Sequence, residues 1–468
     1  MKIHPHELLL EELLESLSDD QRKVLGHALQ CEPCRQKAAE LLRPQRLQLL
    51  RKVGKLLCWP GRARQVDYGP VLERSSRFFR CRQAAYEKER AEAEPLIAEL
   101  LALPAGRRRL CVLNRSRFHT WGLLERLVES SREKSFQDPR EAEGIAELAL
   151  EVAAVLDADY YGVQRIEDLR ARAWGYAGNA RRIHGDLAAA GQAFERAFDH
   201  LKLGTREPIE RAILLDLRAS LLRAERRFPE AMELLEEALA ILLIAGDPHR
   251  AGRVLVNMDN IHHHAGTPEQ GIPLLYRALE LIDPQQEPRL ALCAWHNLVD
   301  DLAEAGCFME AQKILRRAIP IYRQIPEPWS EHRRQWVEGK IARGLGQESR
   351  AEALLGAARD GFLAQDLPYD VALVSLELAA LYAGQGRTAE VRRIAAEMLP
   401  LFSARGIHRE ALAALAFWRR AVESEQGGLA LTSELLAFCK RARFDPELRF
   451  EARNGGRAVD AIEAEPAS

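Results

Sequence analysis

The sequence has no long uninterrupted apolar segment and few aromatic residues. Over 468 residues, Phe, Trp and Tyr together make up 6%, and Met occurs only 5 times. The most apolar stretches, at 49–61 and 233–246, are broken by charged residues, whereas a membrane-spanning helix needs about 20 apolar residues in succession. The first residues are acidic where an export signal would need a basic flank. We therefore expect a soluble, cytoplasmic protein without a membrane partner.

Cysteine is also scarce, and the familiar catalytic motifs are missing. The 8 cysteines are too few for a disulfide framework in a chain of this length, and only one pair of them is closely spaced. The sequence contains no phosphate-binding loop, no G-x-S-x-G nucleophile motif and no HExxH zinc motif. No enzyme class is supported, and we expect a non-enzymatic protein.

The residues that are abundant predict an all-α fold. Apolar residues make up 47% and charged residues 29% of the chain, which is typical of long packed helices. A single core usually stops growing at about 250–300 residues, so a repeat array or several domains are expected. The net charge is only −2, but residues 44–118 hold 17 Lys/Arg against 7 Asp/Glu. We interpret this basic segment as a solvated helical linker, with a polyanion or acidic-partner contact as the alternative, and nucleic acid as an unlikely partner.

A sequence template recurs about every 40 residues. In one copy the turn residue Gly185 is followed by a small residue at +5, a large one at +9 and a small one at +12. Further copies begin at Arg226, Gly266, Gly306, Gly346, Gly386 and Gly427. Glycine readily adopts the left-handed conformation that ends a helix, so each copy predicts a helix, a tight turn and a second helix. A single hairpin cannot bury its apolar face, whereas stacked hairpins can.

These units resemble tetratricopeptide repeats. The residues that carry the resemblance are Trp174, Gly178, Gly185, Ala190, Phe194 and Ala197 in one unit and Trp295, Leu298, Gly306, Ala311, Leu315 and Ala318 in another. The period here is longer than the 34 residues typical of that family. With a degenerate copy at 118–156, the resemblance implies an α-solenoid of about eight hairpins over residues 118–450.

The resemblance further implies a superhelix whose groove is lined by the first helix of each hairpin. The predicted groove residues are Arg172, Asn179, Arg182, Asp216, Arg223, Arg253, Asn260, His263, His296, Asp300, Arg333, Trp336, Lys340 and Arg343. Because this set is basic, it favours a protein segment or peptide with acidic side chains or a free carboxylate. The alternative is solvated helix surface that carries arginine. Corresponding positions in the last two units are apolar, as at Leu373 and Leu376, which predicts either an apolar contact or the packed end of the array.

The sharpest chemical motif is the H-x3-C-x2-C cluster of His27, Cys31 and Cys34. His27 and Cys31 are one helical turn apart, and the spacing of the two cysteines suits two thiolates on one tetrahedral Zn²⁺ ion. His6 is the predicted fourth ligand, with His4 as the alternative. A module of 43 residues has little core, so zinc is expected to stabilise it outright. The alternatives are a redox pair or a chance arrangement.

This stretch resembles the zinc-finger domain of anti-sigma factors. The resemblance implies that residues 1–43, with the basic helices of 44–117, sequester a sigma factor, while the repeats at 118–450 bind a second protein. The residues at 451–468 are expected to form a disordered tail. The alternative function is a general protein–protein interaction scaffold with a purely structural zinc knuckle. The identity of the partner, the input signal and the oligomeric state are left open by the sequence.

Overall fold

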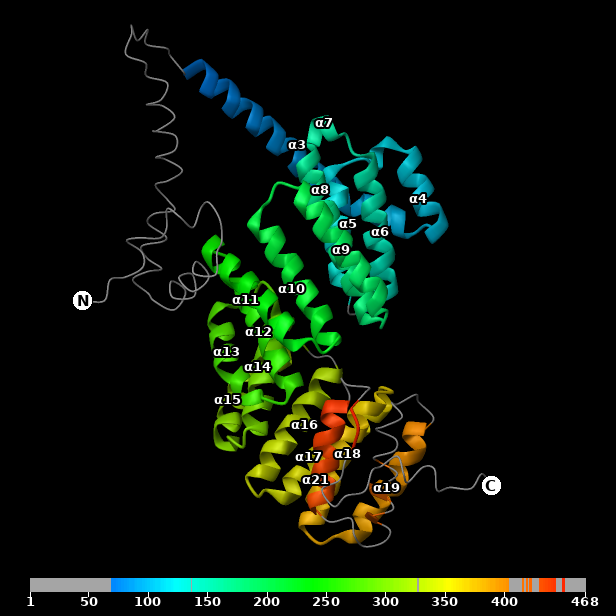
Figure 1. Cartoon of the computed structure of the whole chain (residues 1–468), viewed down its shortest axis with the longest axis vertical. Helices are drawn as coiled ribbons and strands as arrows, with labels where there is room; N and C mark the ends of the chain where they lie inside the picture. Colours follow the sequence, from blue (N-terminus) through cyan, green and yellow to red (C-terminus); the bar gives the residue numbers. More distant parts are fainter. Residues whose placement is uncertain are drawn as a thin grey trace, which may run out of the picture. The chain divides into compact units, whose positions relative to one another are not determined.

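The computed structural model of the protein is helical throughout the residues that it describes. These residues are 69–403 without 136, 326 and 327, together with 415, 418–419, 421–422, 429–442 and 448–450. No strand occurs among them, which confirms the predicted all-α class for this part of the chain (Figure 1). None of the helices in it is both long and apolar enough to cross a membrane. The predicted zinc module at 1–43 and the predicted tail at 451–468 lie outside the described residues.

Contacts between residues divide the described chain into two compact units, and each is described by itself. The first unit contains α3 (Gly69–Leu101), α4 (Ala105–Asn114), η3 (Ser116–Phe118), α5 (Trp121–Lys134), α6 (Pro139–Val155), α7 (Ala158–Tyr161), α8 (Val163–Ile183) and α9 (Leu187–Leu203). The hairpin of α10 (Pro208–Ala224) and α11 (Phe228–Ala245) contributes residues to both units. The second unit contains α12 (Pro248–Ala265), α13 (Pro268–Leu281), α14 (Pro288–Glu304), α15 (Phe308–Gln324), α16 (Pro328–Gly344), α17 (Glu348–Ala364), α18 (Pro368–Gly384), α19 (Thr388–Ser403) and α21 (Leu429–Ala442).

The predicted turn residues are where the first helix of each hairpin ends. They have positive φ angles: Gly185 97°, Arg226 61°, Gly266 81°, Gly306 76°, Gly346 72° and Gly386 72°. At one of these turns, the amide of Cys307 donates to the carbonyl of Leu302 over 2.8 Å and that of Gly306 to Ala303 over 3.1 Å. Such bonds satisfy carbonyl groups that a helix end leaves without partners. The 40-residue template therefore marks these turns correctly, whereas its last predicted turn, at Gly427, lies outside the described residues.

The small and large template positions pack the two helices of a hairpin together. Ala190, Phe194 and Ala197 are all at most 1% exposed, and the equivalent residues of the other hairpins are buried as well. A Cβ atom added at Gly178 would lie 3.1 Å from the ring of Phe194, and one at Gly339 would lie 2.8 Å from the side chain of Leu355. Glycine in the first helix therefore lets the large residue of the second helix approach the backbone closely.

Proline marks the start of the first helices, and the sequence template did not include this signal. Five successive first helices begin at prolines 40 residues apart, namely Pro208, Pro248, Pro288, Pro328 and Pro368. Proline suits the first helical position because its fixed φ angle matches the helix and its missing N–H would have no helical partner there. Each of these five repeats thus begins at a proline and turns at a residue with positive φ.

The core of the first unit joins the basic segment to the first hairpin. Ile97 and Leu100 of α3 and Val112 of α4 are buried in one cluster with Leu123 of α5 and Ile145 of α6. The C-terminal half of α3 therefore packs on the repeats. The predicted domain boundaries at 43, 117 and 450 stay predictions.

The C-terminal end of the second unit is closed by α21. Leu373 and Leu376 of α18 are at most 3% exposed and share a core cluster with Leu435 of α21 and with Trp418. Trp418 donates its indole N–H to Thr432 Oγ1 over 3.0 Å. Figure 1 shows α21, in red, beside α18. For α18, the apolar positions of the predicted groove are therefore the packed end of the array and not an exposed contact.

Candidate functional site

The predicted groove residues are divided between the two units. Arg172, Asn179, Arg182 and Asp216 belong to the first unit, and the other ten to the second. All lie on the first helices α8, α10, α12, α14 and α16, as predicted. Asn179 and Lys340 are buried, and the others are half-buried.

In the first unit, the predicted groove arginines contact partners within the protein. The guanidinium of Arg172 on α8 donates from Nε to Glu210 Oε2 of α10 over 2.9 Å and makes a second bond to Glu210 Oε1. Arg182 donates to the amide oxygen of Asn179, one turn earlier on α8, over 2.8 Å. The arginine pairing between α8 and α10 therefore links the first helices of successive hairpins.

The second unit contains the more complete set. We define its first-helix face as Arg253, Asn260, His263, Cys293, His296, Asp300, Arg333, Trp336, Lys340 and Arg343, from α12, α14 and α16. At its α12 end, Arg253 pairs with Glu287, which also contacts His249 Nε2 over 3.3 Å. His263 donates from Nδ1 to Asp301 Oδ1 over 3.0 Å. These contacts join α12 to the beginning and the end of α14.

A buried ammonium group holds the other end of the first-helix face together. Lys340 Nζ of α16 donates to Asp300 Oδ1 and Glu304 Oε1 of α14, both over 2.7 Å. Burial alone would lower the pKa of Lys340, but the charges of Asp300, Glu304 and Glu377 outweigh burial and raise it above its usual value. Lys340 therefore stays charged.

The C-terminal helix α21 also contributes to this ionic cluster. Lys440 Nζ of α21 lies 2.7 Å from Glu304 Oε1 and 3.3 Å from Glu377 Oε1, and Arg343 also pairs with Glu377. Burial raises the pKa of Glu304, but Lys340 and Lys440 reverse this effect and hold the pKa below its usual value. Three acidic and three basic side chains from α14, α16, α18 and α21 thus neutralise one another.

Two residues in the middle of the first-helix face, Cys293 and His296, are polar but not ionised. Cys293 is exposed, and desolvation by the protein around it raises the pKa of its thiol. His296 accepts at Nδ1 from the hydroxyl of Tyr322 over 2.7 Å. Burial lowers the pKa of His296 to about 4, so its ring is neutral at physiological pH. The charge of Arg333 acts on both Cys293 and His296.

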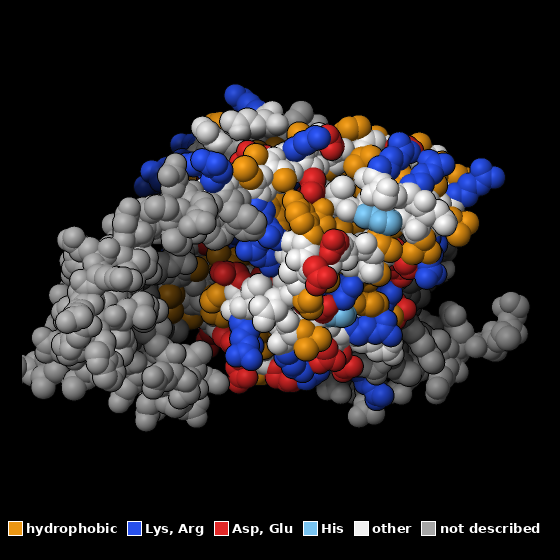
Figure 2. Space-filling view, turned by 90° about the horizontal axis from the view of Figure 1, so that it is seen from above, with side chains coloured by type: hydrophobic (Ala, Val, Ile, Leu, Met, Phe, Trp, Pro, Cys, Tyr) orange, Lys and Arg blue, Asp and Glu red, His pale blue; other side chains and the backbone are white. Residues whose placement is uncertain are grey.

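The structure alters the charge expected for this face. The prediction counted four positions per helix and found a basic surplus, but Arg253, Lys340 and Arg343 all have carboxylates beside them. Glu287, which precedes α14, and Glu377 of α18 lie outside the counted positions, whereas Asp300 is one of them. Elsewhere, on the side of the molecule drawn in Figure 2, basic and acidic side chains likewise occur interspersed with hydrophobic ones. Sequence analysis missed the acidic residue that lies about one repeat away from each of these three basic residues.

A second missed feature is a pair of buried carboxyl groups between α12 and α14. Asp259 is 0% and Asp301 1% exposed. Asn297 donates from Nδ2 to Asp259 Oδ2 over 2.9 Å, while His263 donates to Asp301. Two acids inside a helical core are unusual, because burial strongly disfavours the charged form.

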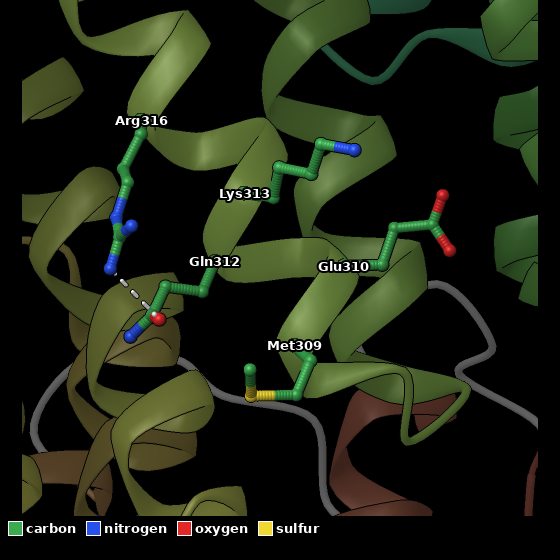
Figure 3. Close-up of a pocket in the computed structure, with 5 residues that line it drawn as sticks. All are labelled: Met309, Glu310, Gln312, Lys313 and Arg316. Atoms are coloured by element: carbon green, nitrogen blue, oxygen red, sulfur yellow. Dashed lines mark hydrogen bonds between the residues drawn. The ribbon is translucent and has the colours of Figure 1, made fainter.

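The predicted zinc ligands His6, His27, Cys31 and Cys34, and the alternative ligand His4, lie outside the described residues. Within the described chain, no three His, Cys, Asp or Glu side chains are arranged to hold a metal ion. An open hollow also lies beside α15 (Figure 3). It is lined by Met309, Glu310, Gln312, Lys313 and Arg316, all from one helix, and Met309 is 71% exposed. A hollow lined by one exposed helix does not enclose a ligand, so we do not regard it as a functional site.

Comparisons with known proteins give a fold and no family. No protein-family model matches the chain, and no curated protein matches its sequence. A solved Rap protein in complex with Competence and Sporulation Factor has a TM-score of 0.50 at 12% identity, over 69% of this chain and 87% of that one. The apo form of RapI has a TM-score of 0.49 at 11% identity over 69% and 97%. Aspartyl phosphate phosphatase F from Bacillus subtilis has 0.46 at 12% over 82% and 95%.

The first of these likenesses supports the fold that the hairpins define. Repeated helix–turn–helix units with buried small and large template positions make the described chain a tetratricopeptide-type α-solenoid. At this level of identity the likeness does not assign a partner or an activity.

Proposed function

We propose that the protein is a non-enzymatic, cytoplasmic regulator that binds another protein or peptide on its first-helix face. The observation that supports this proposal is the convergence of partly accessible Arg, Cys, His and Trp side chains from three successive first helices. Arginine and tryptophan are enriched among residues that dominate binding energy at interfaces. Contacts between α12, α14 and α16 hold these side chains in place before a partner arrives, which reduces the entropy cost of binding.

The partner we propose is an extended segment with acidic side chains or a free carboxylate. A guanidinium has five N–H donors in a planar fork, so Arg253 and Arg343 can contact a further carboxylate beside their internal ones. Arg333 lies next to the neutral Cys293 and His296, where a partner carboxylate would face little repulsion. The solved complex of a Rap protein with its factor is an example of binding by a protein of this fold. Cross-linking from Cys293, which belongs to the face, tests where the partner binds.

We further propose that residues 1–43 form a zinc module that sequesters a sigma factor. The support is the H-x3-C-x2-C spacing of His27, Cys31 and Cys34 and its resemblance to anti-sigma factors. With His6 as fourth ligand the zinc site would be closed, as structural sites are. Its zinc would supply folding energy and no catalysis.

Removal of a zinc ligand is expected to abolish metal binding and sigma-factor binding together. Purified wild-type protein should contain one equivalent of zinc, whereas Cys34→Ser and His6→Ala should contain almost none. Metal content is measured by mass spectrometry, and binding by co-purification with sigma factors of the same cell. Cys307→Ser, which removes an exposed thiol of the repeats, is the matched control and should retain both.

Other outcomes would separate the alternatives. Zinc that is lost in Cys34→Ser but retained in His6→Ala would reject His6 and favour His4. Zinc that is lost while sigma-factor binding is unchanged would support the scaffold alternative, in which the knuckle is only structural. Wild-type protein without zinc would rule out the module altogether.

A further inference from the structure

The buried carboxyl pair of Asp259 and Asp301 occupies positions that are uncharged in the other template copies with turns from Gly185 to Gly386. Asp259 lies seven residues before its turn, where the other hairpins have Gly178, Ala219, Val299, Gly339 and Ala379. Asp301 lies five residues before its turn, where the others have Ala180, Leu221, Ile261, Ile341 and Leu381. A single acid at such a core position would be an isolated exception to the template. Here two such acids lie next to each other.

A third departure makes room for the pair. Five residues after the turn, the other hairpins carry Ala190, Ala231, Ala311, Ala351 and Val391, but here the residue is Gly271. A Cβ atom at Gly271 would lie 2.1 Å from Asp259 Oδ1 and 3.0 Å from Asp301 Oδ2. The two oxygens therefore occupy the space that the methyl group of an alanine would fill. Three substitutions on three helices together build this site.

The hydrogen bonds made by the four carboxyl oxygens of the pair leave room for one proton between them. Asp259 Oδ2 accepts from Asn297, and Asp301 Oδ1 accepts from His263. The other two oxygens, Asp259 Oδ1 and Asp301 Oδ2, are buried without another hydrogen-bond partner among the described residues, and the two carboxyl groups interact with each other. If both were ionised, two negative charges would face each other away from water, at a high cost in free energy. One proton on Asp259 Oδ1, donated to Asp301 Oδ2, satisfies all four oxygens.

We propose that Asp259 and Asp301 share one proton and form a pH-sensitive joint between α12 and α14, which loosens when that proton is lost. The joint is adjacent to the proposed binding site, because His263 belongs to the first-helix face and holds Asp301. A change in the α12–α14 contact would therefore move two of the three helices that present this face. The inference itself does not depend on the identity of the partner.

The surrounding groups favour retention of the proton near neutral pH. Burial, the charge of Asp301 and the hydrogen bond between the carboxyl groups raise the pKa of Asp259 to about 9, opposed by Asn297 and His263. Burial raises the pKa of Asp301 to about 7, and the charges of Asp300 and Glu304 act in the same direction. The hydrogen bond from Asp259 and the charge of Lys340 of α16 oppose this rise. From α13 the pair meets Gly271, which carries no charge.

The sign of the pH dependence follows from these raised pKa values. When α12 and α14 separate, both acids regain ordinary pKa values near 4 and release their protons. The closed joint binds more protons than the open one, so its stability is present at low pH and is lost as pH rises. Between pH 7 and 9 the closed joint binds one more proton than the open joint. The equilibrium constant for closing should therefore fall by up to about tenfold per pH unit.

Hydrogen exchange of the full-length protein tests the joint. Amide protection in α12 and α14, corrected for the intrinsic effect of pH, should fall by about tenfold or more between pH 7 and 9. The α8–α9 hairpin provides an internal reference and should change little. In Asp259→Asn, whose amide can donate permanently to Asp301, protection of α12 and α14 should no longer depend on pH. Asp301→Asn should behave alike, because its amide can donate to Asp259.

Two results would overturn the proposal. One is a wild-type protection profile across pH 7–9 that is as flat as that of either Asn variant. The other is a large loss of amide protection in both Asn variants at pH 7, together with an equal loss in the wild type when Na⁺ is replaced by a bulky organic cation. That result would mean that the two carboxylates hold a small cation and not a proton.

Discussion

Lys340→Met is expected to destabilise the second unit by about 3–5 kcal/mol, the largest effect of any substitution considered for the ionic cluster. The side chain of Lys340 is only 8% exposed, and its ammonium group lies 2.7 Å from both Asp300 and Glu304. Methionine would fill much of the volume but leave Asp300 as an uncompensated buried charge. Urea unfolding of the full-length protein, followed by Trp fluorescence, measures the change in the free energy of unfolding.

Lys440→Met serves as the matched control for Lys340→Met. Lys440 contacts the same Glu304 at the same distance, but its side chain is 27% exposed and water can replace part of the interaction. Its loss should cost no more than about 1 kcal/mol. If the two methionine variants lose the same stability, burial does not set the strength of this cluster, and our account of it fails.

Gly271→Ala should destabilise the second unit by about 3 kcal/mol, although alanine is the better helix former. The new methyl group would collide with Asp259 Oδ1. Gly356→Ala in α17 is the matched control, because a Cβ atom there meets nothing within 4 Å. That control should be stabilised by about 0.5–1 kcal/mol. Both changes are measured by urea unfolding.

A compensating triple substitution sharpens the Gly271→Ala experiment. Asp259→Gly, Asp301→Ile and Gly271→Ala together restore the residues found at Gly339, Ile341 and Ala351. Because apolar residues often replace buried charged ones without loss, the triple variant should be at least as stable as the wild type at pH 8. A triple variant as unstable as Gly271→Ala alone would show that the clash with the carboxyl pair is not the cause.

The repeat template predicted the fold because each of its positions has a local structural role. Gly266 and Gly306 end helices in a left-handed conformation, and Ala311 and Leu315 fill the space between two helices. These requirements recur in every hairpin, so their period is visible in a single sequence. Arg226 was also placed correctly from spacing alone, although arginine is an unusual residue at positive φ.

The charge of the first-helix face could not be predicted in the same way. Whether Lys340 is available to a partner depends on Asp300 and Glu304, which lie about one repeat away and on a different helix. Such pairing follows from the stacking of hairpins and not from the pattern within one of them. The carboxyl pair of Asp259 and Asp301 is different, since it breaks the template at known positions. Alignment of the repeats with one another would have revealed it.

The central claim, that a partner binds on the first-helix face of the second unit, can be tested by cross-linking from two natural cysteines. Cys293 lies on that face, and Cys307 lies at the turn between α14 and α15. Two variants each retain one of these thiols together with Cys31 and Cys34, and both carry a thiol-linked photoreactive group on the retained cysteine. After illumination in cell extract, Cys293 should give a protein adduct of defined mass that an excess of acidic peptide suppresses, and Cys307 should not. Equal adducts from both positions, or none from Cys293, would contradict the account.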